Sequence, residues 1–280
     1  MSYVTRLNRA FKSAPFLPIN HTTKYVFFSD CHRGIGNNND NFLKNSNCLL
    51  AALQYYYQND FCYIEVGDGD ELWENKNGNE IREIHESIFS LLNCFEKSQR
   101  LFMLYGNHDM ERKHESNIYE AVILSTDNPP VNLYVTHGHQ ADFFNSVLWK
   151  FTRFLVRHLW TPLEYFGLHD PTSAAKNNTK RAKVEKRLIH YARNNNCLIL
   201  CGHTHKPTLK RTTSPYFNCG SCVHPKGITC IELTGFDIKL VKWYASVEPS
   251  RHFGDIYCLE PPTYPLYIRR EVLEETKITV

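Results

Sequence analysis

Five short apolar segments of this chain follow one pattern: each ends in Asp, Asn or His, usually beside a glycine. The segments are KYVFFSD (24–30), CYIEVGD (62–68), LFMLYGN (101–107), LYVTHGH (133–139) and CLILCGH (197–203). Each is typical of a buried strand. Helix-like stretches with apolar residues at spacings of three and four, such as NCLLAALQYYYQ and EIREIHESIFSLLNCFEK, lie between them. This alternation predicts an α/β core, in which ligands gather beyond the carboxyl ends of the strands.

The composition fits a globular protein of a reducing compartment. The 280 residues carry a net charge of only +3, which gives no reason to expect a nucleic-acid partner. The N-terminal stretch lacks the apolar core and the cleavage site of a signal peptide, and no window approaches the roughly 20 apolar residues that span a bilayer. We therefore expect a cytoplasmic protein whose ten cysteines are free thiols.

The strand ends supply carboxylate, imidazole and amide side chains that suit a metal site. The residues are Asp30, His32, Asp68, Asn107, His108, His137, His203 and His205. One such ending would be an ordinary turn, but five that converge on one sheet edge would crowd charged and polar groups at a high cost in free energy. Divalent cations offset that cost, and a mixed set of Asp, His and Asn without thiolates suits Mn, Fe or Zn.

In chain order these residues form the series D-x-H, GD-x-x-E/D, GNHD, HGH and GHTH, which resembles the calcineurin-like metallophosphoesterase superfamily. The series runs from Asp30 to His205. GDGDELW and the helical stretch before GHTH are closest in style to the UDP-2,3-diacylglucosamine pyrophosphatase branch. The chain departs from that branch by having His108 in place of Arg and HGH in place of HGD. The resemblance implies an αββα sandwich of two central mixed β-sheets flanked by helices, with a helical insertion.

The resemblance also implies a ligand set for two divalent metal ions, with manganese the first expectation and iron or zinc the alternatives. One ion would be held by Asp30, His32, Asp68 and His205. The other would be held by Asp68, Asn107, His137 and His203, so that Asp68 bridges the pair. Two ions about 3.5–4 Å apart can share a hydroxide, lower its pKa and clamp the phosphoryl oxygens.

His108 is expected to donate a proton to the leaving oxygen, because an imidazole titrates near neutral pH. In the family, an acid three residues after the bridging Asp orients this imidazole; here that residue is Glu71, with Asp70 a close competitor. The candidates for substrate contact are Arg33, Asn107 and His139. The planar guanidinium of Arg33 suits a phosphate oxygen, and an ordinary surface position is the equal alternative.

The chain is expected to form a single domain, 1–280, with a helical insertion or lid at 143–196 and a β-hairpin and C-terminal tail at 206–280. One helical face of 143–160 carries Phe144, Val147, Leu148, Phe151, Leu155 and Leu159, and another carries Lys150, Arg153 and Arg157. The helix is either a lid whose basic and aromatic residues meet substrate, an amphipathic helix resting on a membrane surface, or a helix whose apolar face packs on the α/β body. We expect packing rather than membrane contact, and packing is compatible with a lid. A second basic group is either a solvated face or a recruiter of an anionic substrate; it comprises Lys176, Lys180, Arg181, Lys183, Lys186 and Arg187.

The predicted function is hydrolysis of a phosphate ester or phosphoanhydride by a metal-bridging hydroxide, with a small phosphodiester or a nucleotide-type pyrophosphate favoured as substrate. A serine/threonine phosphoprotein phosphatase is the alternative within the class, although the chain has GDGDELW where those enzymes have GD-x-V-D-R-G. A non-catalytic metal-binding scaffold is the alternative from another class. Such scaffolds often lose metal ligands, whereas the full ligand series is present here.

Overall fold

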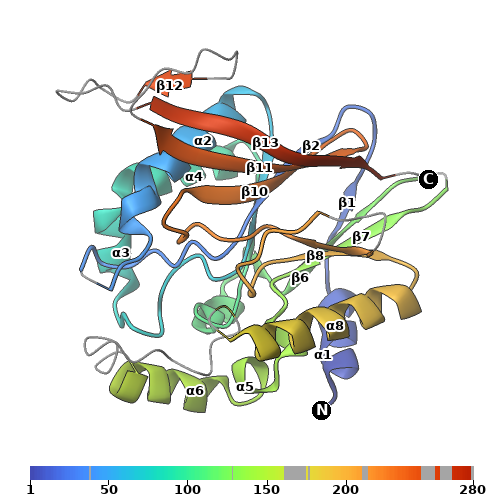
Figure 1. The fold of residues 1–280 in the computed structure, drawn as a ribbon, viewed down its shortest axis with the longest axis horizontal. Helices are drawn as coiled ribbons and strands as arrows, with labels where there is room; N and C mark the ends of the chain where they lie inside the picture. Colours follow the sequence, from blue (N-terminus) through green and yellow to red (C-terminus); the bar gives the residue numbers. More distant parts are fainter. Residues whose placement is uncertain are drawn as a thin grey trace.

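Two mixed β-sheets lie face to face at the centre of the molecule (Figure 1). The computed structural model describes residues 1–37, 39–127, 129–160, 175, 177–209, 214–246, 256–258 and 267–278, with the backbone alone at 160 and 256–258. The large sheet has the strand order β12-β13-β11-β10-β2-β3-β4-β5, and the small sheet has the order β1-β6-β7-β8-β9.

The large sheet combines a parallel half with an antiparallel half. The parallel strands are β2 (Lys24–Phe28), β3 (Cys62–Val66), β4 (Leu101–Leu104) and β5 (Ile118–Tyr119). The antiparallel strands are β10 (Ile228–Thr234), β11 (Asp237–Ser246), β12 (Ile256–Cys258) and β13 (Tyr267–Lys277). The expected hairpin is thus formed by β10 and β11. Part of the stretch that was expected to be a tail is the strand β13, which pairs along β11 with one register shift at Leu240 and Val241.

The small sheet is also mixed. Its strands are β1 (Phe16–Pro18), β6 (Ala121–Ser125), β7 (Asn132–Thr136), β8 (Leu198–Cys201) and β9 (Tyr216–Asn218). The pair β6–β7 is antiparallel, and the other neighbours are parallel. The five apolar segments of the sequence therefore form β2, β3 and β4 of the large sheet and β7 and β8 of the small one.

Successive side chains of each strand face different layers, as the pleat requires. In β2, Tyr25 and Phe27 point into the apolar core between the sheets, whereas Val26 and Phe28 pack toward helices. Helices α2 (Ser46–Gln58) and α4 (Glu86–Lys97) cover the outer face of the large sheet. Helices α1 (Tyr3–Lys12) and α8 (Asn178–Asn194) cover the small sheet. This layering confirms the predicted αββα class.

The helices depart from expectation at two places. The stretch 80–97 is divided between α3 (Gly78–Ile84) and α4, because the backbone at His85 leaves the helical region with φ −109° and ψ 31°. The stretch 143–160 forms three pieces: α5 (Phe143–Ser146), α6 (Trp149–Leu155) and the π-helical η4 (Val156–Trp160). Short 3₁₀ turns complete the described helices: η1 (Leu43–Asn45), η2 (Met110–His114) and η3 (His139–Ala141).

The expectation that the apolar face of 143–160 packs on the body is wrong. Phe144, Val147, Leu148, Phe151 and Leu159 are exposed. The rest of the predicted insertion up to α8, apart from residues 175 and 177, lies outside the described residues, and Lys176 lies outside them too. Within the described part of the chain, none of the helices has the length and apolar character needed to cross a membrane.

Candidate metal centre

The polar strand ends of both sheets meet at one place. Asp30 and His32 follow β2, Asp68 follows β3, and Asn107 follows β4, all in the large sheet. His137 follows β7 in the small sheet, and His203 and His205 follow β8. A hydrogen bond joins the two sheets at this place: the His203 amide, after β8, donates to Asp30 Oδ2, after β2, at 2.9 Å. The carboxyl-edge convergence expected from the sequence is therefore present in the structure.

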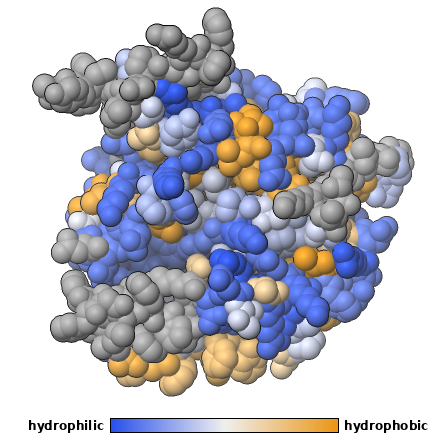
Figure 2. Space-filling view, viewed as in Figure 1, coloured by the Kyte–Doolittle hydropathy of each residue, from blue (hydrophilic) through white to orange (hydrophobic). Residues whose placement is uncertain are grey.

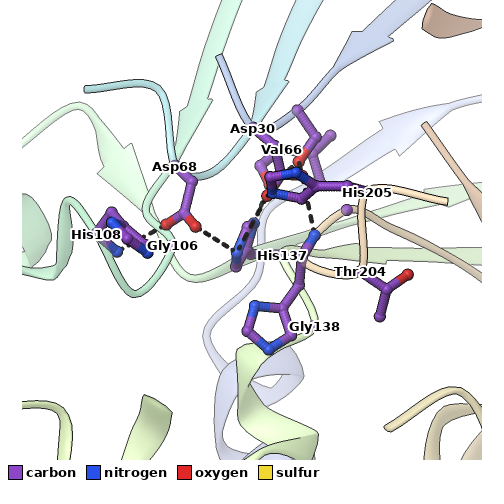
Figure 3. Close-up of polar contacts among 12 residues, drawn as sticks. Asp30, Val66, Asp68, Gly106, His108, His137, Gly138, Thr204 and His205 are labelled. Atoms are coloured by element: carbon purple, nitrogen blue, oxygen red, sulfur yellow. Dashed lines mark hydrogen bonds and ion pairs between the residues drawn. The ribbon is translucent and has the colours of Figure 1, made fainter. Parts of the chain in front are cut away.

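The converging side chains form two groups that could each hold a metal ion: Asp30, His32 and His205 in one group, and Asp68, His137 and His203 in the other. A third such group, His32, Glu71 and His108, shares His32 with the first. In the first group, Asp30 Oδ1 lies 3.0 Å from His205 Nε2, and His32 Nε2 lies 3.3 Å from His205 Nε2. Figure 3 shows Asp30 beside His205, and Asp68 between His108 and His137.

Asp68 stands between the two groups. Its Oδ2 atom lies 3.1 Å from His137 Nε2 and 3.8 Å from His32 Nε2. Its Oδ1 atom accepts a hydrogen bond from the His108 amide at 2.7 Å. One carboxylate oxygen therefore faces both groups while the other holds the turn that carries His108.

Four ligand-type atoms in this centre are buried and make no hydrogen bond: Asp30 Oδ1, Asn107 Oδ1, His137 Nε2 and His203 Nε2. Two of them, Asp30 Oδ1 and His137 Nε2, lie 3.0 and 3.1 Å from other side chains of the two groups without a hydrogen bond. Buried polar atoms are normally paired, because an unpaired one costs about 1–3 kcal/mol. All four belong to the ligand set that the family resemblance implies. The residues present thus fit a pair of cations, which would satisfy these atoms.

The second nitrogens of two ligand-type histidines are held by the protein. His137 Nδ1 donates to the Val66 carbonyl at 2.8 Å, and His32 Nδ1 donates to Glu71 Oε2 at 2.7 Å. These contacts fix each ring and leave its Nε2 atom directed at the centre. His203 has no such hydrogen bond; its Nε2 lies 3.5 Å from Asp142 Oδ2, and Lys180 Nζ lies 3.1 Å from the same oxygen.

The backbone is strained at five of these residues. Asp30, His32, Asp68, His203 and His205 have positive φ values between 48° and 62°. The three other non-glycine residues with positive φ among those described, Asp60, Gln99 and Asn196, follow the C-caps of α2, α4 and α8, where the left-handed conformation is ordinary. Left-handed backbone away from a helix end is costly, and it clusters at functional sites.

Two glycines allow the strand ends to approach closely. A Cβ atom on Gly106 would collide with Asp68 Oδ1, and one on Gly202 would collide with Ser29 Oγ and Asp30 Oδ2. The glycines beside the polar residues in the sequence pattern are therefore needed for close approach rather than only for turns.

Burial and neighbouring charges shift the pKa values of the carboxyl groups and histidines of the centre. Burial opposes ionisation of Asp30 and Asp68, but the neighbouring His205 and His137 hold the pKa of each carboxyl well below its usual range. Against burial, Asp68 and Asp30 raise the pKa of His137 to about 9. Burial and the nearby His137 lower the pKa of His203. The carboxylates are thus ionised at neutral pH, as cation binding requires.

His108 lies beside the two groups with its side chain 21% exposed. Its Nδ1 atom donates to Glu71 Oε1 at 2.7 Å, which leaves Nε2 as the outward nitrogen. Burial opposes the charged ring, but Glu71 and then Asp68 raise the pKa of His108. Between the two candidate orienting acids, the geometry favours Glu71, whose second oxygen also holds His32.

Asp70 is directed elsewhere, into a buried ion-pair network. Arg33 Nε donates to Asp70 Oδ1 at 2.8 Å, and the two terminal nitrogens of Arg33 donate to Glu65 Oε1 and Oε2, both at 2.7 Å. The Arg33 side chain is 0% exposed. This position argues against the substrate contact expected for Arg33 and against an orienting role for Asp70. Arg33 instead neutralises two buried carboxylates.

The other sequence candidates have distinct places. His139 is buried beside His137, which argues against the substrate contact expected for it, and the same burial lowers its pKa well below the usual range. Asp109 accepts from the amides of Gly69 and Gly106, and therefore supports the turn. Asn107 is buried with its unpaired Oδ1 in the centre.

Two residues near His108 were not identified from the sequence. Trp73 stacks on the His108 ring, with a centroid distance of 4.2 Å and an interplanar angle of 23°. Arg157 of η4 donates to the Trp73 carbonyl at 2.6 Å and to the Leu72 carbonyl at 2.8 Å. Trp73 follows the GDGDE block in the sequence, but no local pattern predicts a stacking partner or a contact 84 residues away.

Comparison with known proteins gives one family match. A model described as calcineurin-like phosphoesterase matches residues 23–207, which contain every residue of the two groups. No functionally curated protein matches the sequence.

Among solved structures, a conserved uncharacterized protein from Streptococcus pneumoniae TIGR4, described as a predicted phosphoesterase, is 16% identical with a TM-score of 0.36, covering 79% of this chain and 89% of that one. The cold-active protein-tyrosine phosphatase of a psychrophilic Shewanella species is 13% identical with a TM-score of 0.40, covering 81% and 80%. Because both scores are low, the family assignment rests on the match over 23–207.

Proposed function

Because this chain belongs to the calcineurin-like phosphoesterase family, we propose that it binds two divalent metal ions at the strand ends and hydrolyses a small phosphodiester or a nucleotide-type pyrophosphate. The observation that carries the proposal is the position of Asp68, whose Oδ2 atom faces a ligand group on either side. Hydrolysis of a phosphoric ester follows from the family. The number of ions, their identity and the substrate are the parts that we propose.

The proposed ligands are those of the two groups with Asn107 added. One ion takes Asp30, His32, Asp68 and His205. The other takes Asp68, Asn107, His137 and His203. The neutral amide of Asn107 limits the negative charge that a phosphate meets. Nitrogen and oxygen donors without thiolates favour manganese, with iron and zinc as alternatives.

When bound, a pair of divalent ions lowers the pKa of a water molecule and neutralises phosphoryl oxygens. The protein's own contribution to the chemistry centres on His108. Glu71 accepts from its Nδ1 atom and keeps the ring protonated, so that Nε2 can donate to the leaving oxygen. Trp73 stacks on one face of the same ring and restricts its rotation.

The test separates metal binding from proton donation. Asp68→Asn should lose bound metal together with activity, because it removes charge from the atom that faces both groups. His108→Ala should keep its metal and lose about 10²–10⁴-fold in turnover on an alkyl phosphodiester. On p-nitrophenyl esters, whose leaving group needs little protonation, the loss should be much smaller. An Asp68→Asn protein with normal metal content would exclude the bridging role.

The substrate class and the alternatives are separated by a second assay. Metal analysis of the purified protein, followed by turnover of p-nitrophenyl phosphate and bis-p-nitrophenyl phosphate with added Mn²⁺, distinguishes a monoesterase from a diesterase. A preference for the diester supports the proposal. Rapid turnover of phosphoserine peptides would instead identify a phosphoprotein phosphatase, and metal binding without turnover of any ester would identify a scaffold.

A further inference from the structure

The three helical pieces α5, α6 and η4 together form an amphipathic segment with its apolar side turned outward. Its exposed apolar side chains are Phe143, Phe144, Val147, Leu148, Phe151, Phe154 and Leu159, which are seven of the thirteen large exposed apolar residues in the described part of the chain. Phe151 and Phe154 are 57% and 59% exposed. Figure 2 shows the apolar rim along the lower edge of the molecule, over α5 and α6. A contiguous apolar surface of this kind marks an interaction site.

The polar side of the same segment attaches it to the domain. Asn145 and Thr152 are buried, and Thr152 Oγ1 joins α6 to α5 by donating to the Phe144 carbonyl at 3.1 Å. Arg153 pairs with Glu111, and Arg157 donates to the carbonyls of Leu72 and Trp73. The orientation is therefore fixed by specific polar contacts. A rotation that buried the phenylalanines would break these contacts.

Basic side chains surround the apolar rim. The ammonium groups of Lys113 and Lys150 each lie 5.7 Å from the Trp149 ring centroid, and Lys180 lies 5.7 Å from that of Phe144. Residues 143–160 contain three lysines or arginines, one histidine and no acidic residue. Aromatic side chains in an apolar face beside lysines are the composition of helices that lie in the interface of a bilayer.

We propose that α5–α6–η4 docks this protein on the surface of an anionic lipid bilayer, with Phe151 and Phe154 entering the headgroup region and Lys113 and Lys150 facing the lipid phosphates. This proposal does not depend on the reaction that the metal centre catalyses. A second copy of the chain fits the surface less well. A two-fold interface places like patches against each other, so the lysines of both copies would repel.

The experiment uses the full-length, metal-loaded protein and sedimentation with large vesicles, either pure phosphatidylcholine or phosphatidylcholine with one quarter phosphatidylglycerol. The wild type should bind the anionic vesicles more strongly, and salt should weaken this binding. The double variant Phe151→Ser/Phe154→Ser should bind at least about tenfold more weakly, because it removes two inserted aromatic side chains. Lys113→Gln/Lys150→Gln should lose the preference for phosphatidylglycerol.

The matched control is Val272→Ser/Leu273→Ser on β13, where both side chains are 41% exposed outside the docking surface. It should bind vesicles like the wild type. Unchanged turnover of a water-soluble ester by each variant verifies folding. The proposal is overturned if the wild type does not bind anionic vesicles, or if the phenylalanine and control variants bind equally. It is also overturned if light scattering shows a dimer that the phenylalanine variant abolishes while vesicle binding is unchanged.

Discussion

Replacement of Arg33 by methionine tests whether this residue is structural. The guanidinium makes three charge-assisted hydrogen bonds of 2.7–2.8 Å to Glu65 and Asp70, and it lies 5.1 Å from the Phe89 ring centroid. Methionine keeps most of the apolar stem but leaves Glu65 with Tyr63 as its remaining hydrogen-bond partner among the interactions described. Removing one partner of a buried ion pair costs about 3–5 kcal/mol. Because both carboxylates are nearly inaccessible, we expect a loss in this range.

The measurement is urea unfolding at fixed metal concentration, because bound metal itself stabilises the folded state. Arg33→Met should lower the midpoint without changing the slope. The control is Lys239→Met, which removes an exposed pair with Glu275 at 3.5 Å and should cost at most about 1 kcal/mol. The double variant Arg33→Met/Glu65→Leu should recover part of the loss, because it removes the stranded carboxylate.

Two results would refute this reasoning. A loss no larger than that of Lys239→Met would show that the buried network contributes no more than a surface pair. Unchanged stability together with a large rise in KM would show that Arg33 contacts substrate after all.

Three further predictions concern the metal centre. Glu71→Gln should move the alkaline limb of the kcat/KM profile to lower pH on a substrate with a poor leaving group. The active form of His108 is the protonated one, and Glu71 raises its pKa. Without the Glu71 charge, the ring should lose its proton at a lower pH. The absence of a shift relative to wild type would exclude Glu71 as the orienting acid. Trp73→Leu should reduce kcat on the same substrate by roughly 2–10-fold, the worth of one aromatic stack, with little change on p-nitrophenyl esters; an equal loss on both would indicate a general structural role. Gly202→Ala should destabilise the fold by about 1–3 kcal/mol and weaken metal binding, because the added methyl group meets Ser29 and Asp30. Scanning calorimetry measures the stability, and titration calorimetry with Mn²⁺ measures the affinity for metal. An unaltered affinity would show that the strand ends can separate without weakening metal binding.

The convergence of the strand ends could be predicted from the sequence, because it follows from strand direction. Asp30, Asp68 and Asn107 end parallel neighbours in one sheet, so their meeting needs no knowledge of side-chain packing. The choice between Asp70 and Glu71 could not be predicted in this way. These residues are adjacent in the chain, and their directions depend on Arg33 and His108, which are distant in sequence.

The orientation of the 143–160 segment shows a second limit. Its apolar periodicity correctly identified a face, but periodicity does not say whether that face points inward. The direction is set by Arg153 and Arg157, whose partners are Glu111 and the carbonyls of Leu72 and Trp73. Likewise, Glu65 interrupts an apolar strand in the sequence, which signals a buried charge but not its partner.

The left-handed backbone at five of the proposed ligands sets a limit on how stable this protein can become. Each such residue costs about 1–2 kcal/mol relative to ordinary backbone, and the sum is comparable to the net stability of a typical domain. Glycine at His32 or His205 would relieve part of that strain while deleting a ligand. Selection for thermal stability alone would therefore favour inactive variants at these positions, so an engineering screen on this fold has to select for bound metal at every round.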